Sequence, residues 1–269
     1  MLKDITLGQY FPGDTIAHRL DPRTKILLVV LYIVALFCAN SLLAYGILAL
    51  VLAVCVRVSH VGLKSLVRGL KPVVFIIVFT GVLNLFFTPG DHTLVEWGVL
   101  RITETGARNA LFMVLRIMLL IMGTFLMTYT TSPISLTDGL EQLLNWMKKL
   151  HVPVHELSMM MSIALRFIPT LIEETDKIMS AQKARGADFE SGSIIQKAKA
   201  LIPILVPLFV SAIRRAEELA TAMECRCYHG GEGRTKLHVL QYAGRDYAAL
   251  ALGVVITAGI IALRQLAVQ

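Results

Sequence analysis

Two arginine motifs contain the residues best suited to specific binding in this sequence. Ala184-Arg185-Gly186 is followed, forty-one residues later (226 − 185 = 41), by Cys225-Arg226-Cys227. A guanidinium presents a rigid fork of N–H donors that matches a carboxylate. Small flanking residues allow the end of a helix to enter a groove. The two motifs therefore favour docking on a soluble partner over catalysis.

Each arginine closes a long helical pattern, over about 155–185 and about 194–226. In both segments apolar residues recur at alternating spacings of three and four, which is typical of helices packed along their length. Each helix would be about 45–50 Å long. The seams are Leu157, Met161, Ala164, Ile168, Leu171, Thr175, Ile178, Gln182 and Arg185, and Ile195, Ala198, Ile202, Leu205, Phe209, Ala212, Ala216, Leu219, Met223 and Arg226.

These helices have two interpretations. In the simpler one they only pack together, and the arginines are C-terminal charges favoured by the helix dipole. In the other they are levers that dock on partners. The methionines of the first helix suit a surface that repacks against partners. Pro169, Pro203 and Pro207 allow bends in both helices.

Three other motifs lack the arrangement of a catalytic or metal site. Pro153 interrupts the helix that would align His151 with His155. Cys225-x-Cys227-x-His229 offers only three ligands. The glycine-rich segment 230–236 lacks the G-x-x-x-x-G-K-[ST] spacing of a phosphate loop. We therefore expect no catalytic residue, no bound metal and no nucleotide in this chain.

The composition indicates a membrane protein. Hydrophobic residues make up 55% of the 269 residues, and the mean hydropathy is +0.66. Several apolar runs are long enough to cross the hydrocarbon core. The net charge of +7 then marks cytoplasmic segments rather than nucleic-acid binding. The four cysteines form no disulfide framework, and the first thirteen residues predict no cleaved signal peptide.

We predict an all-α polytopic membrane protein with about five transmembrane helices, two long helices and a shorter interfacial helix. Residues 1–130 contain the N-terminal segment and four spans, 131–243 the long helices and the interfacial helix at about 136–149, and 244–269 the last span. The spans lie at about 26–39, 42–56, 72–87, 106–130 and 246–263. Asp21 and Pro22 predict the start of the first helix.

Loop charges predict the orientation. The loop 57–71 is basic and has no acid, whereas 88–105 is mostly acidic. By the positive-inside rule, the basic loop and the N-terminus are cytoplasmic. Arg116, inside the fourth span, would cost roughly 2.5–3.5 kcal/mol against lipid. It therefore either pairs inside the bundle or contacts a substrate.

The sequence resembles the transmembrane T component (EcfT) of energy-coupling factor transporters, which is related to the cobalt-transport CbiQ family. The resemblance covers essentially the whole chain. It rests on Gly8-Gln9-Tyr10, Gly13-Asp14, the segment His18 to Lys25, Ala184-Arg185-Gly186-Ala187 and the segment Glu224 to Arg234. The family often has Ala and Gly around its second arginine. Both are Cys here, a departure that bears on how the second helix ends.

The resemblance implies a non-catalytic subunit of the bacterial cytoplasmic membrane. Such a subunit joins two ABC-type ATPases, which bind ATP and Mg, to one or several membrane-embedded S components that capture vitamins or other micronutrients. Arg185 and Arg226 would be the ATPase anchors, flanked by Ala184, Gly186, Cys225 and Cys227. The S component would contact Met160, Met161, Ala164, Leu165, Ile202, Leu205 and Phe209.

Three alternatives remain open from the sequence. Within the family, the chain could serve a dedicated cobalt or nickel importer. The segment Gly8 to Lys25 favours instead the shared type, in which one coupling subunit serves several S components. A self-contained channel or secondary transporter predicts ionisable residues in several spans or an inverted repeat. A membrane enzyme needs an acid–base or metal constellation. Asn84, Arg108, Asn109 and Arg116 are the main polar residues of the spans.

Overall fold

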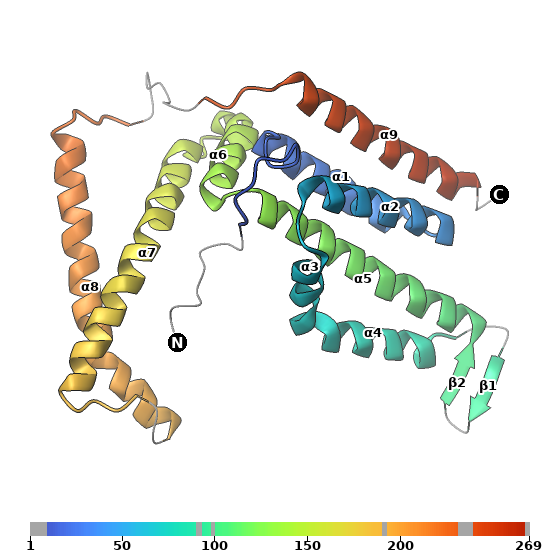
Figure 1. Cartoon of the computed structure of the whole chain (residues 1–269), viewed down its shortest axis with the longest axis horizontal. Coiled ribbons are helices and arrows are strands. Elements are labelled where there is room, and N and C mark those ends of the chain that lie inside the picture. Colours follow the sequence, from blue (N-terminus) through green and yellow to red (C-terminus); the bar gives the residue numbers. More distant parts are fainter. Residues whose placement is uncertain (1–9, 90–92, 98–99, 190–192, 231–238, 267–269) are drawn as a thin grey trace. The chain divides into compact units, whose positions relative to one another are not determined.

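The computed structural model describes residues 10–89, 93–97, 100–189, 193–230 and 239–266 (Figure 1). The chain divides into two compact units. The bundle unit contains residues 8–139 and 240–269, and the long-helix unit contains 1–7 and 140–239.

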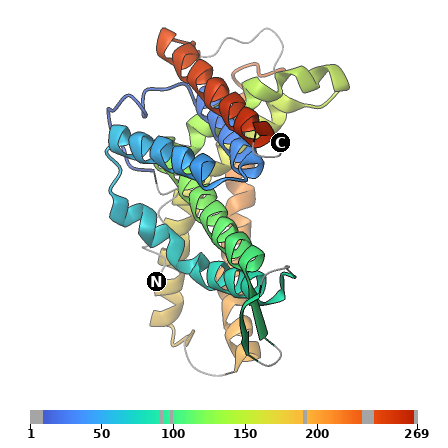
Figure 2. The ribbon, with the colours of Figure 1, turned by 90° about the vertical axis from the view of Figure 1, so that its right-hand side faces the viewer.

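Helices form the bundle unit. They are α1 (Pro22–Cys38), α2 (Leu42–Ser59), α3 (Leu63–Leu70), α4 (Val74–Phe87), α5 (Glu104–Thr130) and α9 (Gly244–Leu266). Figure 2 shows α9 lying along α1, with α5 crossing beneath them. Four helices are long and apolar enough to cross a membrane: Leu42–Ser59, Leu63–Phe87, Glu104–Thr130 and Gly244–Gln265. With 17 residues, or about 26 Å, α1 is shorter than these four.

The third apolar helical segment begins at Leu63, earlier than the residue 72 that the sequence predicts. Residues 57–71 were expected to be a loop, but α3 begins at Leu63 and continues through the 3-10 turn η1 (Lys71–Val73) into α4. Pro72 explains the turn, because it has no N–H to continue the α-helical ladder of α3. Helices α3 and α4 therefore follow one another without a loop, and the chain bends sharply between them at this turn (Figure 1).

The acidic loop 88–105 contains the one β-hairpin among the described residues. Strands β1 (Thr93–Trp97) and β2 (Leu100–Thr103) pair antiparallel, with Trp97 opposite Leu100. Both strands are rich in β-branched and aromatic residues and are separated by two positions, which is a hairpin pattern. The all-α polytopic class is confirmed, and the short hairpin lies between two of the spans.

Arg116 of α5 lies inside the bundle, as one of the two interpretations predicted. Its Nε donates to Tyr45 Oη at 3.1 Å, and its Nη2 donates to the carbonyl of Ala39 at 3.3 Å. Tyr45 is only 2% exposed and belongs to the core formed by α1, α2 and α5. Arg116 thus ties α5 to α2 and to the turn before it.

A buried polar network joins the start of α1 to the start of α9. The Asp21 side chain caps α1 by accepting from the Arg23 N–H at 2.9 Å, as expected. Asp246, 1% exposed, accepts from the backbone N–H of Asp21 and from that of Ala243, both at 2.8 Å. The Arg23 guanidinium pairs with Asp21 at 2.7 Å and lies 3.9 Å from the ring centre of Tyr242. These contacts hold the N-terminal end of α9 against the N-terminal end of α1.

The long-helix unit contains α7 (Val154–Ala184) and α8 (Ile194–Glu224). The shorter helix α6 (Pro133–Leu143), which crosses the sequence boundary between the units, is followed by the 3-10 segment η2 (Leu144–Leu150). The interfacial helix expected at about 136–149 therefore starts three residues earlier and changes type at residue 144. Pro133 explains the early start, because proline is favoured in the first turn of a helix.

Candidate functional site

The C-terminal end of α7 closes in a left-handed turn just after Arg185. Gly186 has φ +87°. The Gly186 N–H donates to the carbonyl of Lys183, and the Ala187 N–H donates to that of Gln182, both at 3.0 Å. This pair of bonds is the Schellman motif, in which a glycine ends the helix. Arg185 is therefore the last residue before the chain leaves the helix axis.

The end of α8 has the same hydrogen-bond pattern with a different residue at the left-handed position. Cys227 has φ 54°. The Cys227 N–H donates to the carbonyl of Glu224 at 2.9 Å, and the Tyr228 N–H donates to that of Met223 at 3.1 Å. Arg226 thus occupies the position at the end of α8 that Arg185 occupies at the end of α7. The shared turn is not evident from the sequence, because cysteine is not a usual residue for a left-handed helix end.

Both arginines are available for a partner. Arg185 and Arg226 are exposed, and neither forms an ion pair within the described part of the chain. The flanking residues of both motifs are exposed as well, and Cys225 and Cys227 are free thiols. A free guanidinium with small or compact neighbours at a helix end can form a bidentate contact with a carboxylate.

We predict that Cys227→Gly raises the unfolding temperature of the chain. A non-glycine residue in the left-handed region costs roughly 1–2 kcal/mol, and the larger entropy of an unfolded glycine offsets part of that gain. The expected net gain is up to about 1 kcal/mol. Cys225→Gly is the matched control, because Cys225 has φ −57° in a helical conformation and should lose stability. Equal losses in both variants would contradict the strain at Cys227.

The two long helices cross at a polar contact. Arg215 Nη2 of α8 donates to Glu174 Oε2 of α7 at 2.9 Å, and the Ser211 hydroxyl donates to Glu174 Oε1. Figure 1 shows that α8 runs back along α7, so their C-terminal ends lie at opposite ends of the pair. Glu174 precedes Arg185 by eleven residues, and Arg215 precedes Arg226 by eleven. Each arginine is therefore about 16 Å along its helix from the crossing.

The crossing contact should respond to acid. The Ser211 hydroxyl, and then Arg215, hold the pKa of Glu174 below its ordinary 4.5. A depressed carboxyl pKa contributes stability that is complete above pH 4.5 and is lost as the pH falls through the lower folded value. We expect Glu174→Gln to lower the unfolding temperature at pH 7 and to match the wild type in strong acid. Glu173→Gln, at an exposed neighbour, should leave the pH profile unchanged; the same change in both would refute the role of Glu174.

The residues predicted to contact an S component are mostly exposed. Met160 and Met161 on α7 are 54% and 52% exposed. Ile202, Leu205 and Phe209 on α8 are between 54% and 67% exposed. Ala164 is exposed and Leu165 is half-buried. Apolar side chains exposed along both helices indicate a surface that lipid or another protein covers.

These apolar residues form two groups rather than one patch. On each helix they lie N-terminal to the crossing at Glu174 and Ser211. Since the helices run in opposite directions, the α7 group and the α8 group lie on opposite sides of that crossing. A partner that touches both groups must therefore lie across the pair.

The two histidines near the start of α7 have different environments. His151 ends η2 with φ 60° and is exposed. His155 Nδ1 lies 3.0 Å from Glu141 Oε1, and the Ser158 hydroxyl donates to Glu141 Oε2 at 2.9 Å. The pair is thus separated by the break at Pro153, as the sequence analysis argued, and His155 fastens α6 to α7.

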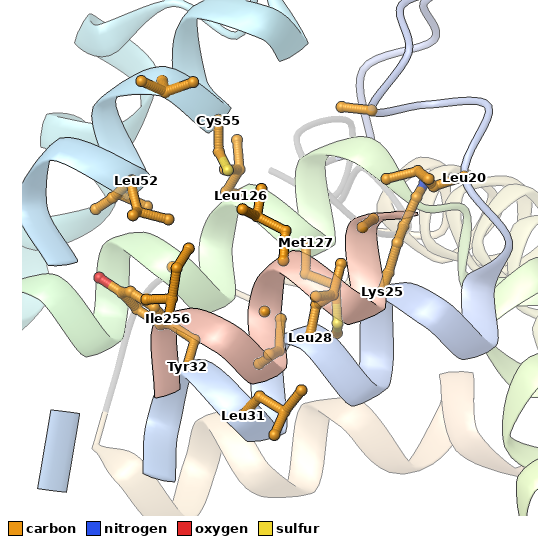
Figure 3. Close-up of a pocket in the computed structure, with 18 of the residues that line it drawn as sticks. Leu20, Lys25, Leu28, Leu31, Tyr32, Leu52, Cys55, Leu126, Met127 and Ile256 are labelled. Carbon is orange, nitrogen blue, oxygen red and sulfur yellow. The ribbon is translucent and has the colours of Figure 1, made fainter. Parts of the chain in front are cut away.

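The bundle unit contains an apolar pocket of about 290 Å³. Figure 3 shows its lining from α1, α2, α5 and α9, including Leu28, Leu52 and Ile256. Lys25 lies at its edge and donates to the carbonyls of Thr130 at 2.8 Å and His18 at 3.2 Å. The lining suits hydrocarbon rather than a charged or strongly polar substrate.

Comparison with known proteins gives consistent matches over nearly the whole chain. The family described as cobalt transport protein (CbiQ) matches residues 13–237. An energy-coupling factor transporter transmembrane protein EcfT from Clostridium kluyveri is 55% identical over 250 residues, 93% of each chain. The EcfT of Ruminiclostridium cellulolyticum is 49% identical over 261 residues, 97% of each chain. That of Bacillus subtilis is 48% identical over 264 residues, 98% of this chain and all of the relative.

Proposed function

Since this chain belongs to the CbiQ family and, within it, to the energy-coupling factor transporter transmembrane proteins, we propose that it is the coupling subunit of such a transporter. It links two cytoplasmic ABC-type ATPases to a membrane-embedded S component that carries a vitamin or another micronutrient. The observation that carries this proposal is the equivalence of Arg185 and Arg226. Both end a long helix in the same backbone turn, and both are exposed.

The arginines dock the ATPases. Each guanidinium enters a groove of one ATPase and meets carboxylates there, with a geometry that lysine would not reproduce. The turn after each arginine bends the chain away from the helix axis, which leaves the helix end free to enter the groove. Ala184, Gly186, Cys225 and Cys227 flank the contact.

The long helices transmit the motion. ATP binding closes the ATPase dimer and draws the arginine-bearing ends together, and the crossing at Glu174 and Arg215 transfers this movement along both helices. The apolar groups on α7 and α8 then shift the S component, which reorients or leaves. ATP and Mg are bound by the ATPases, so the chain itself has no catalytic role.

The subunit lies in the bacterial cytoplasmic membrane with its N-terminus in the cytoplasm. The starts of α1 and α9 and the ends of α2 and α5 share one end of the bundle, as the contacts of Asp21 with Asp246, of Lys25 with Thr130 and of Tyr129 with Ser65 indicate. The basic residues between α2 and α4 are at this end. The positive-inside rule therefore assigns it to the cytoplasm.

The test is co-purification of the tagged full chain from its own cell in mild detergent, followed by mass spectrometry. We expect two ABC-type ATPase subunits and one or several small membrane proteins. Several different membrane partners identify a shared module, whereas one identifies a dedicated importer such as the cobalt transport description of the family suggests. Purification of the intact chain without any ATPase would refute the proposal.

A self-contained channel or secondary transporter is less well supported. Arg116 is the central ionisable residue of α5, and its donors are directed to Tyr45 and to the carbonyl of Ala39. The pocket in the bundle is lined mainly by apolar side chains. Transport of a charged substrate through these spans would need free polar groups along a path.

A further inference from the structure

The short helix α3 is held rigidly against α5. Leu66 and Leu70 are 1% and 6% exposed, and Tyr129 Oη of α5 donates to the carbonyl of Ser65 at 3.3 Å. The approach is close at Gly69, where a Cβ atom would come within 2.7 Å of the Phe125 ring. The orientation of α3, and therefore of its outer side chains, is fixed by this packing.

The outward side of α3 has an apolar surface and a basic surface. Leu63 and Val67 are 68% and 59% exposed, one turn apart. Lys64 and Arg68 are also exposed and one turn apart. At about 100° per residue, the basic pair is turned by about a quarter of the circumference from the apolar pair. A helix with adjacent apolar and basic outer surfaces suits the boundary between acyl chains and headgroups.

The basic surface extends beyond α3 on both sides. Arg57 in the last turn of α2, His60 in the turn between the helices, and Lys71 at the start of η1 are all exposed. Lys64 and Arg68 complete the group. We call these five residues the α3 basic surface.

Few acids lie near the α3 basic surface in the described part of the chain. Asp14 is one, because its neighbours Gly13 and Thr15 line a pocket together with His60, Gly62 and Ser65. The segment 22–90 contains no Asp or Glu. The helix packed against α3 is α5, which has one acid, Glu104, in its first turn at the far end. None of the five residues forms an ion pair with any residue in the described ranges of the chain. The surface therefore carries an excess of positive charge where α4 enters the bilayer.

We propose that the α3 basic surface binds the headgroups of anionic phospholipids. The phosphate lies against Lys64 and Arg68, the remaining basic residues hold neighbouring headgroups, and the acyl chains pack on Leu63 and Val67. The depth of α3 supports this occupant, because the exposed apolar side chains of α4, starting at Val74 and Phe75, follow directly after η1. The inference concerns lipid selectivity and does not depend on the proposed ATPase docking.

The experiment measures lipid selectivity of the full chain. The chain is purified in detergent, incubated with equal amounts of phosphatidylglycerol and phosphatidylcholine, and the two bound lipids are counted by native mass spectrometry. We expect the wild type to retain more phosphatidylglycerol. Each basic residue near an anionic surface strengthens binding about fivefold, so Lys64→Gln with Arg68→Gln should lower the preference by roughly tenfold or more.

The control removes the same number of charges at the other end of the bundle. Arg108 near the start of α5 and Arg264 near the end of α9 are exposed, and changing both to Gln should leave the preference unchanged. The charge-conserving pair Lys64→Arg with Arg68→Lys should also retain it. Unfolding temperatures in pure phosphatidylcholine nanodiscs confirm that each variant folds.

A second readout separates headgroup binding from other roles. In nanodiscs, added phosphatidylglycerol should raise the unfolding temperature of the wild type. About 1 M salt should remove this gain, because it shortens the screening length to about 3 Å. The proposal is overturned if the Gln pair at Lys64 and Arg68 keeps the full preference, or if the control pair loses it equally. Unchanged lipid selectivity with lost ATPase co-purification would assign the surface to protein docking instead.

Discussion

Reversing both helix-end charges, Arg185→Glu with Arg226→Glu, is expected to abolish association with the ATPases. Each arginine is exposed at a helix end and has no internal partner among the described residues, so its contact energy is available to a partner. Removing one member of a desolvated charge pair costs about 2–5 kcal/mol. In the proposed docking, reversal also adds repulsion against the carboxylates of the ATPase groove. Losing the binding energy of both contacts should leave the complex too weak to survive co-purification. The measurement is the amount of ATPase recovered with the tagged chain.

The matched control uses arginines of the same two helices. Arg166 on α7 and Arg214 on α8 are exposed and lie N-terminal to the arginine-bearing ends. Changing both to Glu alters the charge equally, and we expect the ATPases to remain bound. Single substitutions at Arg185 and Arg226 should each weaken the complex without abolishing it. Full ATPase recovery with the double helix-end variant would rule out these arginines as anchors.

Replacing Asp246 by alanine is expected to destabilise the bundle unit by about 3 kcal/mol. The carboxylate is 1% exposed and accepts two backbone N–H groups. Leaving a buried donor unsatisfied costs about 1–3 kcal/mol. The substitution also removes a negative charge that acts on the buried ammonium of Lys25. Thermal unfolding of the full chain in detergent measures the loss.

Two variants make this prediction specific. Asp246→Asn keeps one carbonyl acceptor, so its loss should lie between those of the wild type and the alanine variant. Asp14→Ala removes an exposed carboxylate from the same unit and should change the unfolding temperature little. If Asp14→Ala and Asp246→Ala prove equally harmless, the network between α1 and α9 does not stabilise the bundle.

The long helices could be predicted closely because local signals mark their ends. Gly186 permits the left-handed turn after α7. Ser193 and Gln196 form a capping box at the start of α8, where the Ser193 N–H donates to Gln196 Oε1 at 2.9 Å. Periodicity then predicts the length between such signals. The sequence predicts where α8 ends but not the left-handed turn that ends it, because Cys227 adopts a backbone conformation that residues other than glycine disfavour.

Other features depend on contacts that a single sequence does not reveal. Asp21 and Asp246 are 225 residues apart. No spacing rule predicts that the Asp246 carboxylate accepts a hydrogen bond from the backbone N–H of Asp21. Helix α3 is not predicted from the sequence, because its eight residues are too few to show a helical periodicity. The contact between Glu174 and Arg215 is not predictable from the sequence, since the register between two helices depends on how they pack. The hairpin, by contrast, has a sequence pattern from which it could be predicted: two short β-rich runs separated by two residues.

The crossing of α7 and α8 gives the long-helix unit an approximate twofold symmetry within a single chain. The helices are antiparallel, both arms from the Glu174–Arg215 contact are eleven residues long, and both end in the same turn. An object with this symmetry fits best on a partner that repeats one surface about a twofold axis, as a dimer does. In the proposed docking, each half of such a dimer meets the same arginine-ended turn, whether the two halves are identical or only similar.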